Sequence, residues 1–169
     1  SPVSYCQDDI ATALTASGAA TYNWYKGNTA SGEIVCSTAE FTTPPLDVNT
    51  TYTVKGTGGN GCTSTQSVTV TVNDKPTISA ITQPSQLCAG DALTLTTPTV
   101  TNNGSNITSQ GWFLNGVAFT SGTVVSYADN GKTLVYKATN NCGETTSNEV
   151  TITVNDKPTI SAITQPSQL

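Results

Sequence analysis

The sequence predicts an all-β protein with two tandem β-sandwich domains, followed by the leftover first strand of a next repeat. Three observations support this fold class. The segment Thr71–Leu87 occurs again, letter for letter, at Thr153–Leu169, so the chain repeats with a period of 82 residues. Short runs of Thr interleaved with Val, Ile, Leu and Tyr have the composition of half-buried strands. Apolar residues nowhere recur at helical spacing over more than one turn, so essentially no helix is expected.

The period divides the chain into two repeats and a remainder. Repeat 1 covers residues 1–73 and lacks most of its first strand, and repeat 2 covers residues 74–155. Residues 156–169 form a linker and the first strand of a next repeat. We interpret the chain as a piece of a longer tandem array, because self-similarity at a fixed period is the signature of repeat proteins.

In repeat 2 the apolar alternation predicts about seven short strands, separated by turn residues, which is the pattern of a β-sandwich. They are Pro76–Leu87, confined to an edge by its prolines, then Ala92–Leu95, Gly111–Leu114, Val117–Phe119, Val124–Tyr127, Thr133–Thr139 and Val150–Val154. Repeat 1 follows the same plan. Its loops differ in length, which a shared scaffold tolerates.

Aromatic residues at matching strand positions predict the two cores. The residues expected there are Trp24, Trp112, Tyr52 and Tyr136. Tyr25 and Phe113 follow the tryptophans by one residue, so their side chains should point to the opposite face. If exposed, they are candidate contact points for a glycan or a partner; if covered, they form a second packing surface.

Five cysteines raise the question of disulfides. Cys6 and Cys88 align at the period, and Cys62 and Cys142 align across a turn that reads NGC in one repeat and NNC in the other. We expect one bond inside each repeat, Cys6–Cys62 and Cys88–Cys142, each worth about 4 kcal/mol and typical of small extracellular domains. Cys36 has no counterpart, so it is predicted to be an unpaired thiol, with an intermolecular or alternative bridge as the other interpretation.

Charge and composition argue against several function classes. The net charge of −5 and the lack of a basic stripe argue against binding to nucleic acid or to an anionic membrane surface. No apolar run is long enough to insert into a membrane. Without His no Ser-His-Asp arrangement exists, so an enzyme is not expected. No ligand spacing predicts a metal site, and no cofactor is expected.

Motifs occur in a fixed order along repeat 1: a Cys, then ALT, YNWY, TTYTV, NGCTST and VTVTVN, ending in KP. The most specific parts are Asn60–Asn73 and its counterpart Asn141–Asn155. This order resembles the Ig-like or PKD-like tandem repeats of Bacteroidetes cell-surface adhesins, of the gliding-motility (SprB) type secreted by the type IX system. The resemblance implies two tandem Ig-like domains, a place on the bacterial cell surface and a role in adhesion or display. It brings no catalytic or ligand-binding residues.

The favoured hypothesis is therefore a structural repeat of a long extracellular adhesin or filament, which provides reach and display. Strands of about ten residues at roughly 3.3 Å each would make a domain about 35–40 Å long. The expected joint between repeats is Asn73, Asp74, Lys75 and Pro76, where the proline limits bending and the two charges set the tilt.

The spare strand suggests how neighbouring repeats or identical subunits join head to tail. Thr159–Leu169 has the sequence that repeat 1 would normally receive as its first strand. Pairing would satisfy an open sheet edge and bury Ile160, Ile163 and Leu169. The alternative hypothesis is a domain that binds a glycan or surface polysaccharide through a variable loop, either Gly27–Pro45 or Asn102–Ser109.

Overall fold

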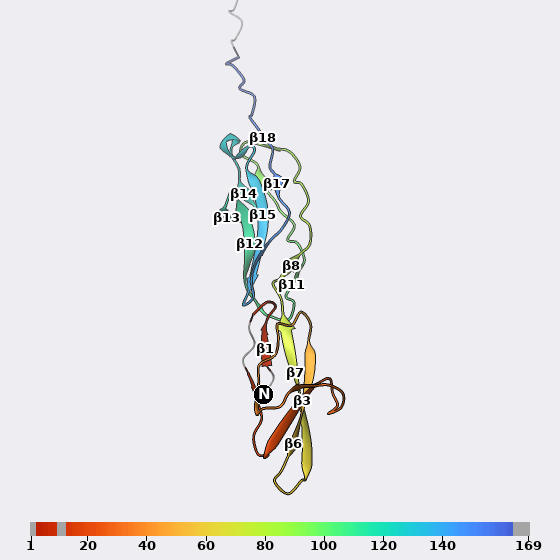
Figure 1. Cartoon of the computed structure of the whole chain (residues 1–169). Coiled ribbons are helices and arrows are strands. Elements are labelled where there is room, and N and C mark those ends of the chain that lie inside the picture. Colours follow the sequence, from red (N-terminus) through yellow and green to blue (C-terminus); the bar gives the residue numbers. More distant parts are fainter. Residues whose placement is uncertain (1–2, 10–12, 164–169) are drawn as a thin grey trace, which may run out of the picture. The chain divides into compact units, whose positions relative to one another are not determined.

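The computed structural model describes residues 3–9 and 13–163, and its strands divide into two compact units (Figure 1). Unit 1 consists of Ser1–Thr77, Asn102–Thr108 and Thr139–Glu144, and unit 2 of Ile78–Thr101, Ser109–Ala138 and Thr145–Leu169. The prediction of an all-β fold is confirmed. The only helix among the described residues is the single 3-10 turn η1 (Tyr127–Asp129).

Unit 1 is built on a five-stranded sheet with the order β1-β7-β6-β3-β4. These strands are β1 (Val3–Cys6), β3 (Thr21–Lys26), β4 (Ile34–Cys36), β6 (Thr50–Thr57) and β7 (Thr63–Asn73). β1 runs parallel to β7, and the other neighbours are antiparallel. A second sheet pairs β2 (Leu14–Thr15) with β5 (Glu40–Phe41). Figure 1 shows β3, β6 and β7 side by side.

The core of repeat 1 draws on alternate positions of these strands, since side chains two residues apart share a face. Its buried members are Leu14, Trp24, Phe41, Leu46, Tyr52, Val54 and Val70. The ring of Phe41 lies edge-on to Tyr52, with centroids 5.0 Å apart, and 5.8 Å from the ring of Trp24. Burial raises the pKa of the Tyr52 hydroxyl, with a smaller contribution from Tyr5.

Repeat 2 uses the same plan with shorter strands. Its main sheet has the order β13-β12-β15-β16, and β17 also pairs with β15. These strands are β12 (Ile107–Leu114), β13 (Val117–Phe119), β15 (Thr133–Asn140), β16 (Gly143–Thr146) and β17 (Val150–Thr151). Three pairs complete the fold: β8 (Thr77–Ile78) with β11 (Val100–Thr101), β9 (Leu87–Cys88) with β18 (Val154–Asn155), and β10 (Ala92–Leu93) with β14 (Thr123–Val124).

The two repeats share the same parallel register at one sheet edge. Tyr5 lies opposite Val72 in β1 and β7, and one period later Leu87 lies opposite Val154 in β9 and β18. The core of repeat 2 contains the buried residues Ile81, Leu93, Trp112, Leu114, Val125, Leu134, Tyr136, Ile152 and Val154. Trp112 packs edge-on against Tyr136 with centroids 5.1 Å apart, and burial raises the pKa of the Tyr136 hydroxyl.

Several predicted strands differ from those observed: for example, Ala92–Leu95 ends at Leu93, and the strand predicted from Gly111 begins at Ile107. Pro76–Leu87 forms strands only at its two ends, β8 and β9, because side chains bond the backbone between them. Val124–Tyr127 ends as a strand at Val124, where the chain turns into η1. Val150–Val154 is divided between β17 and β18, and between them the N–H of Ile152 still donates to the carbonyl of Lys132 (3.0 Å), the next position in the β15–β17 register.

The predicted leftover strand Thr159–Leu169 is only partly described. Residues 156–163 form no strand, and Ile160 and Ile163 are exposed. Leu169 lies outside the described residues.

The turn η1 is held by the carboxylate of Asp129. One of its oxygens accepts hydrogen bonds from the backbone N–H (2.8 Å) and the hydroxyl (3.0 Å) of Ser126. The other lies 2.6 Å from Nζ of Lys132, with both side chains partly exposed to solvent. The hydrogen bond from Lys132, followed by those from Ser126, lowers the pKa of Asp129 below its ordinary value.

Asp129→Asn should therefore lower the free energy of unfolding by about 1 kcal/mol at neutral pH, the usual worth of such a capping contact. Because the folded-state pKa is lowered, the contribution is complete above the ordinary carboxyl pKa of 3.8 and is lost as the pH falls through the lowered value. Urea unfolding at neutral pH and near pH 2 measures the difference. Asp156→Asn, at an exposed carboxylate, is the control. If Asp129→Asn lowers the free energy of unfolding by the same amount near pH 2 as at neutral pH, this role of the carboxylate is contradicted.

Candidate functional site

The predicted joint residues lie in unit 1, where side chains of asparagines hold their backbone. The N–H of Asp74 donates to the Asn103 carbonyl (3.0 Å), and the side-chain amide of Asn103 donates to the Lys75 carbonyl (2.7 Å). Pro76 is fully buried. The N–H of Lys75 donates to the carboxylate of Asp74 (2.6 Å), so the backbone of the joint is held by asparagines and by its own aspartate. No salt bridge between Asp74 and Lys75 is observed in the described part of the chain, and the prediction that their charges set the tilt of the joint stays a prediction.

Asn140 is the central polar residue of this joint, and the sequence analysis did not single it out. It is only 3% exposed. Its side-chain amide donates to the carbonyls of Asp74 (2.7 Å) and Asn102 (3.0 Å), and its side-chain oxygen accepts the N–H of Cys142 (2.8 Å). The signal that could have found it is the pair of matching turns, Asn60-Gly61-Cys62 and Asn140-Asn141-Cys142.

Close backbone approach at the joint requires glycine at two positions. Gly104 has a φ of +90°, and a Cβ there would lie 2.4 Å from Oδ1 of Asn73. Gly143 has a φ of +131°, and a Cβ there would lie 2.9 Å from Cε of Lys75. A side chain at either site would strain the backbone, and at Gly104 it would also collide with Asn73, whereas at Gly143 the flexible end of Lys75 could move aside.

The disulfide of the structure joins Cys6 to Cys142, with Cα atoms 5.3 Å apart and 136 residues between them in sequence. The predicted pairs Cys6–Cys62 and Cys88–Cys142 are therefore wrong. Cys6 ends β1 opposite Asn73, the last residue of β7, whereas Cys62 directly precedes the first residue of β7. An extended strand of that length separates the two by roughly 33 Å, far beyond the reach of a disulfide.

The other three cysteines are free thiols. Cys62 and Cys88 are exposed, contrary to their predicted pairing. Cys36 is partly buried, and its Sγ lies 3.1 Å from Oγ1 of Thr38 and 3.4 Å from the Glu40 carbonyl oxygen. Cys36 therefore has polar neighbours on one side and also packs against the hydrophobic core of repeat 1.

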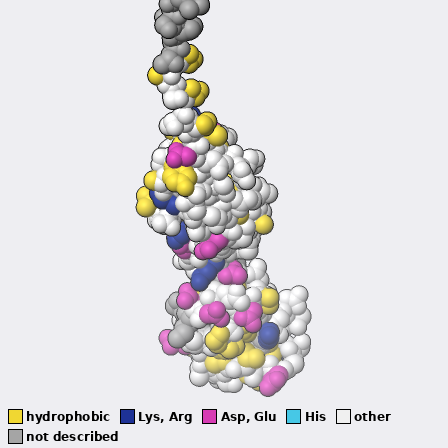
Figure 2. Space-filling view, turned by 90° about the horizontal axis from the view of Figure 1, so that it is seen from above, with side chains coloured by type: hydrophobic (Ala, Val, Ile, Leu, Met, Phe, Trp, Pro, Cys, Tyr) yellow, Lys and Arg dark blue, Asp and Glu magenta, His cyan; other side chains and the backbone are white. Residues whose placement is uncertain are grey.

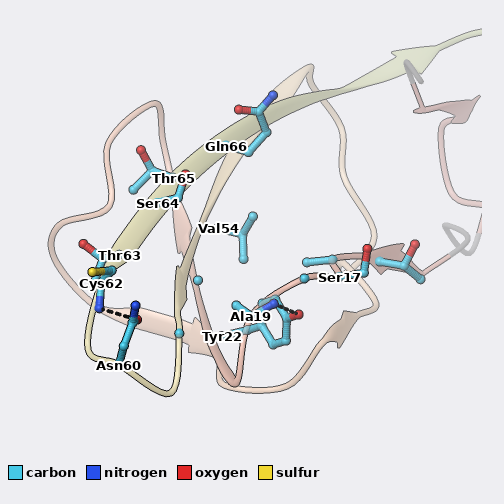
Figure 3. Close-up of a pocket in the computed structure, with 15 residues that line it drawn as sticks. Ser17, Ala19, Tyr22, Val54, Asn60, Cys62, Thr63, Ser64, Thr65 and Gln66 are labelled. Carbon is cyan, nitrogen blue, oxygen red and sulfur yellow. Dashed lines mark hydrogen bonds between the residues drawn. The ribbon is translucent and has the colours of Figure 1, made fainter.

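A groove opens in unit 1 along β7, between that strand and the segment from β2 to Tyr22 (Figure 3). It consists of two adjoining hollows of about 550 and 780 Å³. Val54 and Gln66 line both hollows, and Trp24 lines the larger one. The groove therefore gives access to the hydrophobic core of repeat 1.

In repeat 2 the corresponding place is filled by Ile81, which is 6% exposed and belongs to the core. The side chain of Asn148 brackets its backbone: Oδ1 accepts the Ile81 N–H (2.7 Å) and Nδ2 donates to its carbonyl (3.0 Å). Next to it, the side-chain amide of Gln83 donates to the Thr151 carbonyl. One period before Asn148 stands Gln66, a side chain with the same amide group, in the open groove of repeat 1.

The two candidate ligand contacts are covered. Tyr25 is 8% exposed, which is the covered one of the two alternatives. Phe113 is partly buried, and Nζ of Lys137 lies 5.4 Å from its ring centroid. These rings serve as a second packing surface, so they do not provide an open platform on which a sugar could stack.

The remaining surface offers little for catalysis or metal binding. On the face shown in Figure 2 most of the surface is neutral, with acidic and basic side chains scattered over it. Within the described ranges, no three or more His, Cys, Asp or Glu side chains gather as a metal site. No helix of the described part of the chain is long and apolar enough to cross a bilayer.

Comparison with known proteins supports the Ig-like fold. Residues 1–76 match the family described as Ig-like domain CHU_C associated. No curated protein matches the chain. Among solved structures, the I-band fragment I67-I69 from titin superposes with a TM-score of 0.59 at 12% identity, covering 92% of this chain and 63% of that fragment. Extracellular domains 3-5 of Drosophila OTK give a TM-score of 0.50 at 12% identity, covering 91% and 59%.

This chain thus spans less than two thirds of the length of either fragment, and identities this low establish the fold alone. Together with the sheets described above, they identify the chain as an all-β protein with the fold of tandem Ig-like domains.

Proposed function

We propose that the chain is a structural and adhesive repeat of a long extracellular surface adhesin or filament, in which consecutive repeats are tied together to provide reach and display. The Cys6–Cys142 disulfide is the observation that carries this proposal. Cys6 belongs to the opening strand of repeat 1, and Cys142 to the last hairpin of repeat 2. A covalent bond from one repeat to the next suits a load-bearing array outside the reducing cytosol.

The groove of repeat 1 supports a second part of the same function. We propose that it receives the segment of which Thr159–Leu169 is a copy, from a neighbouring repeat of a longer chain or from a second molecule. The supporting observation is repeat 2, where the identical sequence Thr77–Leu87 fills the corresponding place. By this correspondence Ile163 takes the position of Ile81, and the Gln66 amide brackets its backbone as Asn148 does.

Donation of this segment would cover the exposed apolar side chains of the donor. Ile160 and Ile163 are 89% and 92% exposed, and the core residues Leu14, Trp24 and Val54 line the groove that would receive them. Burial of a fully exposed isoleucine contributes about 1.5–3 kcal/mol, and the bracketing amide adds backbone hydrogen bonds. Partners of this kind are neighbouring repeats or identical subunits joined head to tail.

The reach of the array is tested by small-angle scattering on proteins with two and four repeats. With monomeric samples, the maximum dimension should grow linearly with the number of repeats, because each added repeat is tied to its neighbour at a hydrogen-bonded, proline-containing joint. The control replaces Asn73, Asp74, Lys75 and Pro76 with glycine and serine, which should give a broader distribution of distances. A dimension that grows only with the square root of repeat number in the parent protein would reject the proposal.

A further inference from the structure

We propose that Cys62 and Cys88 are the two halves of a second disulfide that repeats the Cys6–Cys142 bond between consecutive copies of this chain. Cys88 of one copy bonds to Cys62 of the next. The inference rests on the proposed function, in which repeats join head to tail. It is carried by the local structure of the two free cysteines, which matches that of the two bonded ones.

The turn that follows Cys88 is the same as the turn that follows Cys6. The Asp9 N–H donates to the Cys6 carbonyl (3.0 Å), and the Asp91 N–H donates to the Cys88 carbonyl (3.0 Å). In both turns the third residue has a positive φ, 68° at Asp8 and 93° at Gly90. Cys88 is therefore presented by its repeat in the way that Cys6 is.

Both turns are also anchored alike to the last strand of their repeats. The N–H of Gln7 donates to the Asn73 carbonyl (2.8 Å), and one period later the N–H of Ala89 donates to the Asn155 carbonyl (2.8 Å). Cys6 and Cys88 are thus equivalent in sequence position. They are also equivalent in the backbone hydrogen bonds of the turn that follows each of them and in the bond that anchors this turn to the last strand.

The turn that holds Cys62 matches the turn that holds Cys142. The N–H of Cys62 donates to Oδ1 of Asn60 (3.1 Å), as the N–H of Cys142 donates to Oδ1 of Asn140 (2.8 Å). In the formed joint, Nδ2 of Asn140 donates to the carbonyl of Asp74. Asp74 recurs one period later as Asp156, which is exposed and available to Asn60 of another copy.

The positions of the two bonded cysteines in consecutive repeats determine which repeat can supply a partner for Cys62 and for Cys88. Cys6–Cys142 joins the leading turn of one repeat to the last hairpin of the repeat that follows. By the same rule Cys88 needs the hairpin of a repeat after its own, and Cys62 needs the leading turn of a repeat before its own. Within one 169-residue chain the matching cysteines, Cys142 and Cys6, are already bonded. A second copy supplies both partners, as would adjacent repeats in a longer chain.

The chemistry is thiol–disulfide exchange with a small disulfide oxidant such as glutathione disulfide. The thiolate of one cysteine attacks the oxidant and releases one glutathione thiolate, and the second cysteine then displaces the other. One Sγ–Sγ bond forms and the S–S bond of the oxidant breaks. The two electrons reduce one glutathione disulfide to two glutathione thiols, which take up the two protons.

The test is oxidation of the full chain by glutathione disulfide, followed by non-reducing electrophoresis and mass spectrometry of the cross-linked peptides. The wild-type protein should give a ladder of multimers that contain a Cys62–Cys88 peptide. Cys62→Ser and Cys88→Ser should each lose the ladder, and an equimolar mixture of the two variants should stop at a dimer. The matched control Cys36→Ser should keep the full ladder.

Two results would overturn the inference. One is a dimer yield from either single variant that equals the yield from the mixture, because random oxidation of exposed thiols predicts this. The other is a Cys62–Cys88 peptide found only in monomers. Sedimentation of the double variant Cys62→Ser/Cys88→Ser separates this inference from the proposed strand donation. If the double variant self-associates while the wild-type protein forms no ladder, only the disulfide is wrong; if it stays monomeric while the ladder forms, only the donation is wrong.

Discussion

Ile81→Ala is expected to lower the free energy of unfolding of repeat 2 by about 2–4 kcal/mol, whereas Ile163→Ala leaves the unfolding of the monomer unchanged. The two isoleucines occupy the same place in identical stretches of sequence. Ile81 is a core residue, so its truncation leaves a cavity between the sheets. Ile163 is 92% exposed in the monomer, so its truncation there removes no buried contacts.

The measurement is urea unfolding followed by tryptophan fluorescence, at a concentration low enough to keep the protein monomeric. The proposed strand donation predicts a second effect, which concerns Ile163 alone. At high concentration Ile163→Ala should weaken head-to-tail association in sedimentation equilibrium. Ile163→Asp should abolish it, because burying a carboxylate beside core residues such as Trp24 and Val54 carries a large desolvation cost. Unchanged association of Ile163→Asp would remove the groove as the docking site.

Cys6→Ser is expected to destabilise the native chain by up to about 5 kcal/mol, the second large effect. On chain-entropy grounds the cost grows with the length of the closed loop, and Cys6 and Cys142 are separated by 136 residues. Urea unfolding of the oxidised protein and the variant measures the difference. The effect should appear in the transition of the segments that make up unit 1, which contain both cysteines.

The other cysteines provide the controls for this prediction. In the monomer, Cys36→Ser, Cys62→Ser and Cys88→Ser should each change stability little, because these thiols are free. If Cys62→Ser or Cys88→Ser instead costs as much as Cys6→Ser, the bonds lie within the repeats, as the sequence alone led us to expect.

The fold could be predicted from the sequence because its determinants are local and periodic. Alternation of Thr with Val in β7, for example, specifies both a strand and its buried face. Trp24 and Tyr52 lie in the core because large aromatic side chains at alternating positions have no other low-energy place. The start of η1 was missed, since the contacts of Asp129 with Ser126 and Lys132 leave no periodic signature.

The joint and the disulfide were harder to predict, because they depend on which strand ends meet. Alignment shows that Cys6 and Cys88 are equivalent but not which end of its repeat each occupies. The length of β7 could have excluded the Cys6–Cys62 pair, had strand length been compared with disulfide reach. Asn140 and Asn148 bond backbone groups more than sixty residues away, and no local pattern marks such partners.

The loop closed by Cys6 and Cys142 is longer than one repeat, and this has a mechanical consequence. When the two ends of the chain are pulled apart, tension passes through the sulfur–sulfur bond rather than through the residues that it encloses. The separation of 136 residues corresponds to roughly 450 Å of extended chain that a pulling force cannot release while the bond is intact. The buried residues Trp24 and Trp112 both lie inside that protected stretch, so stretching in an oxidising environment should yield only a short extension, which reduction would lengthen several-fold.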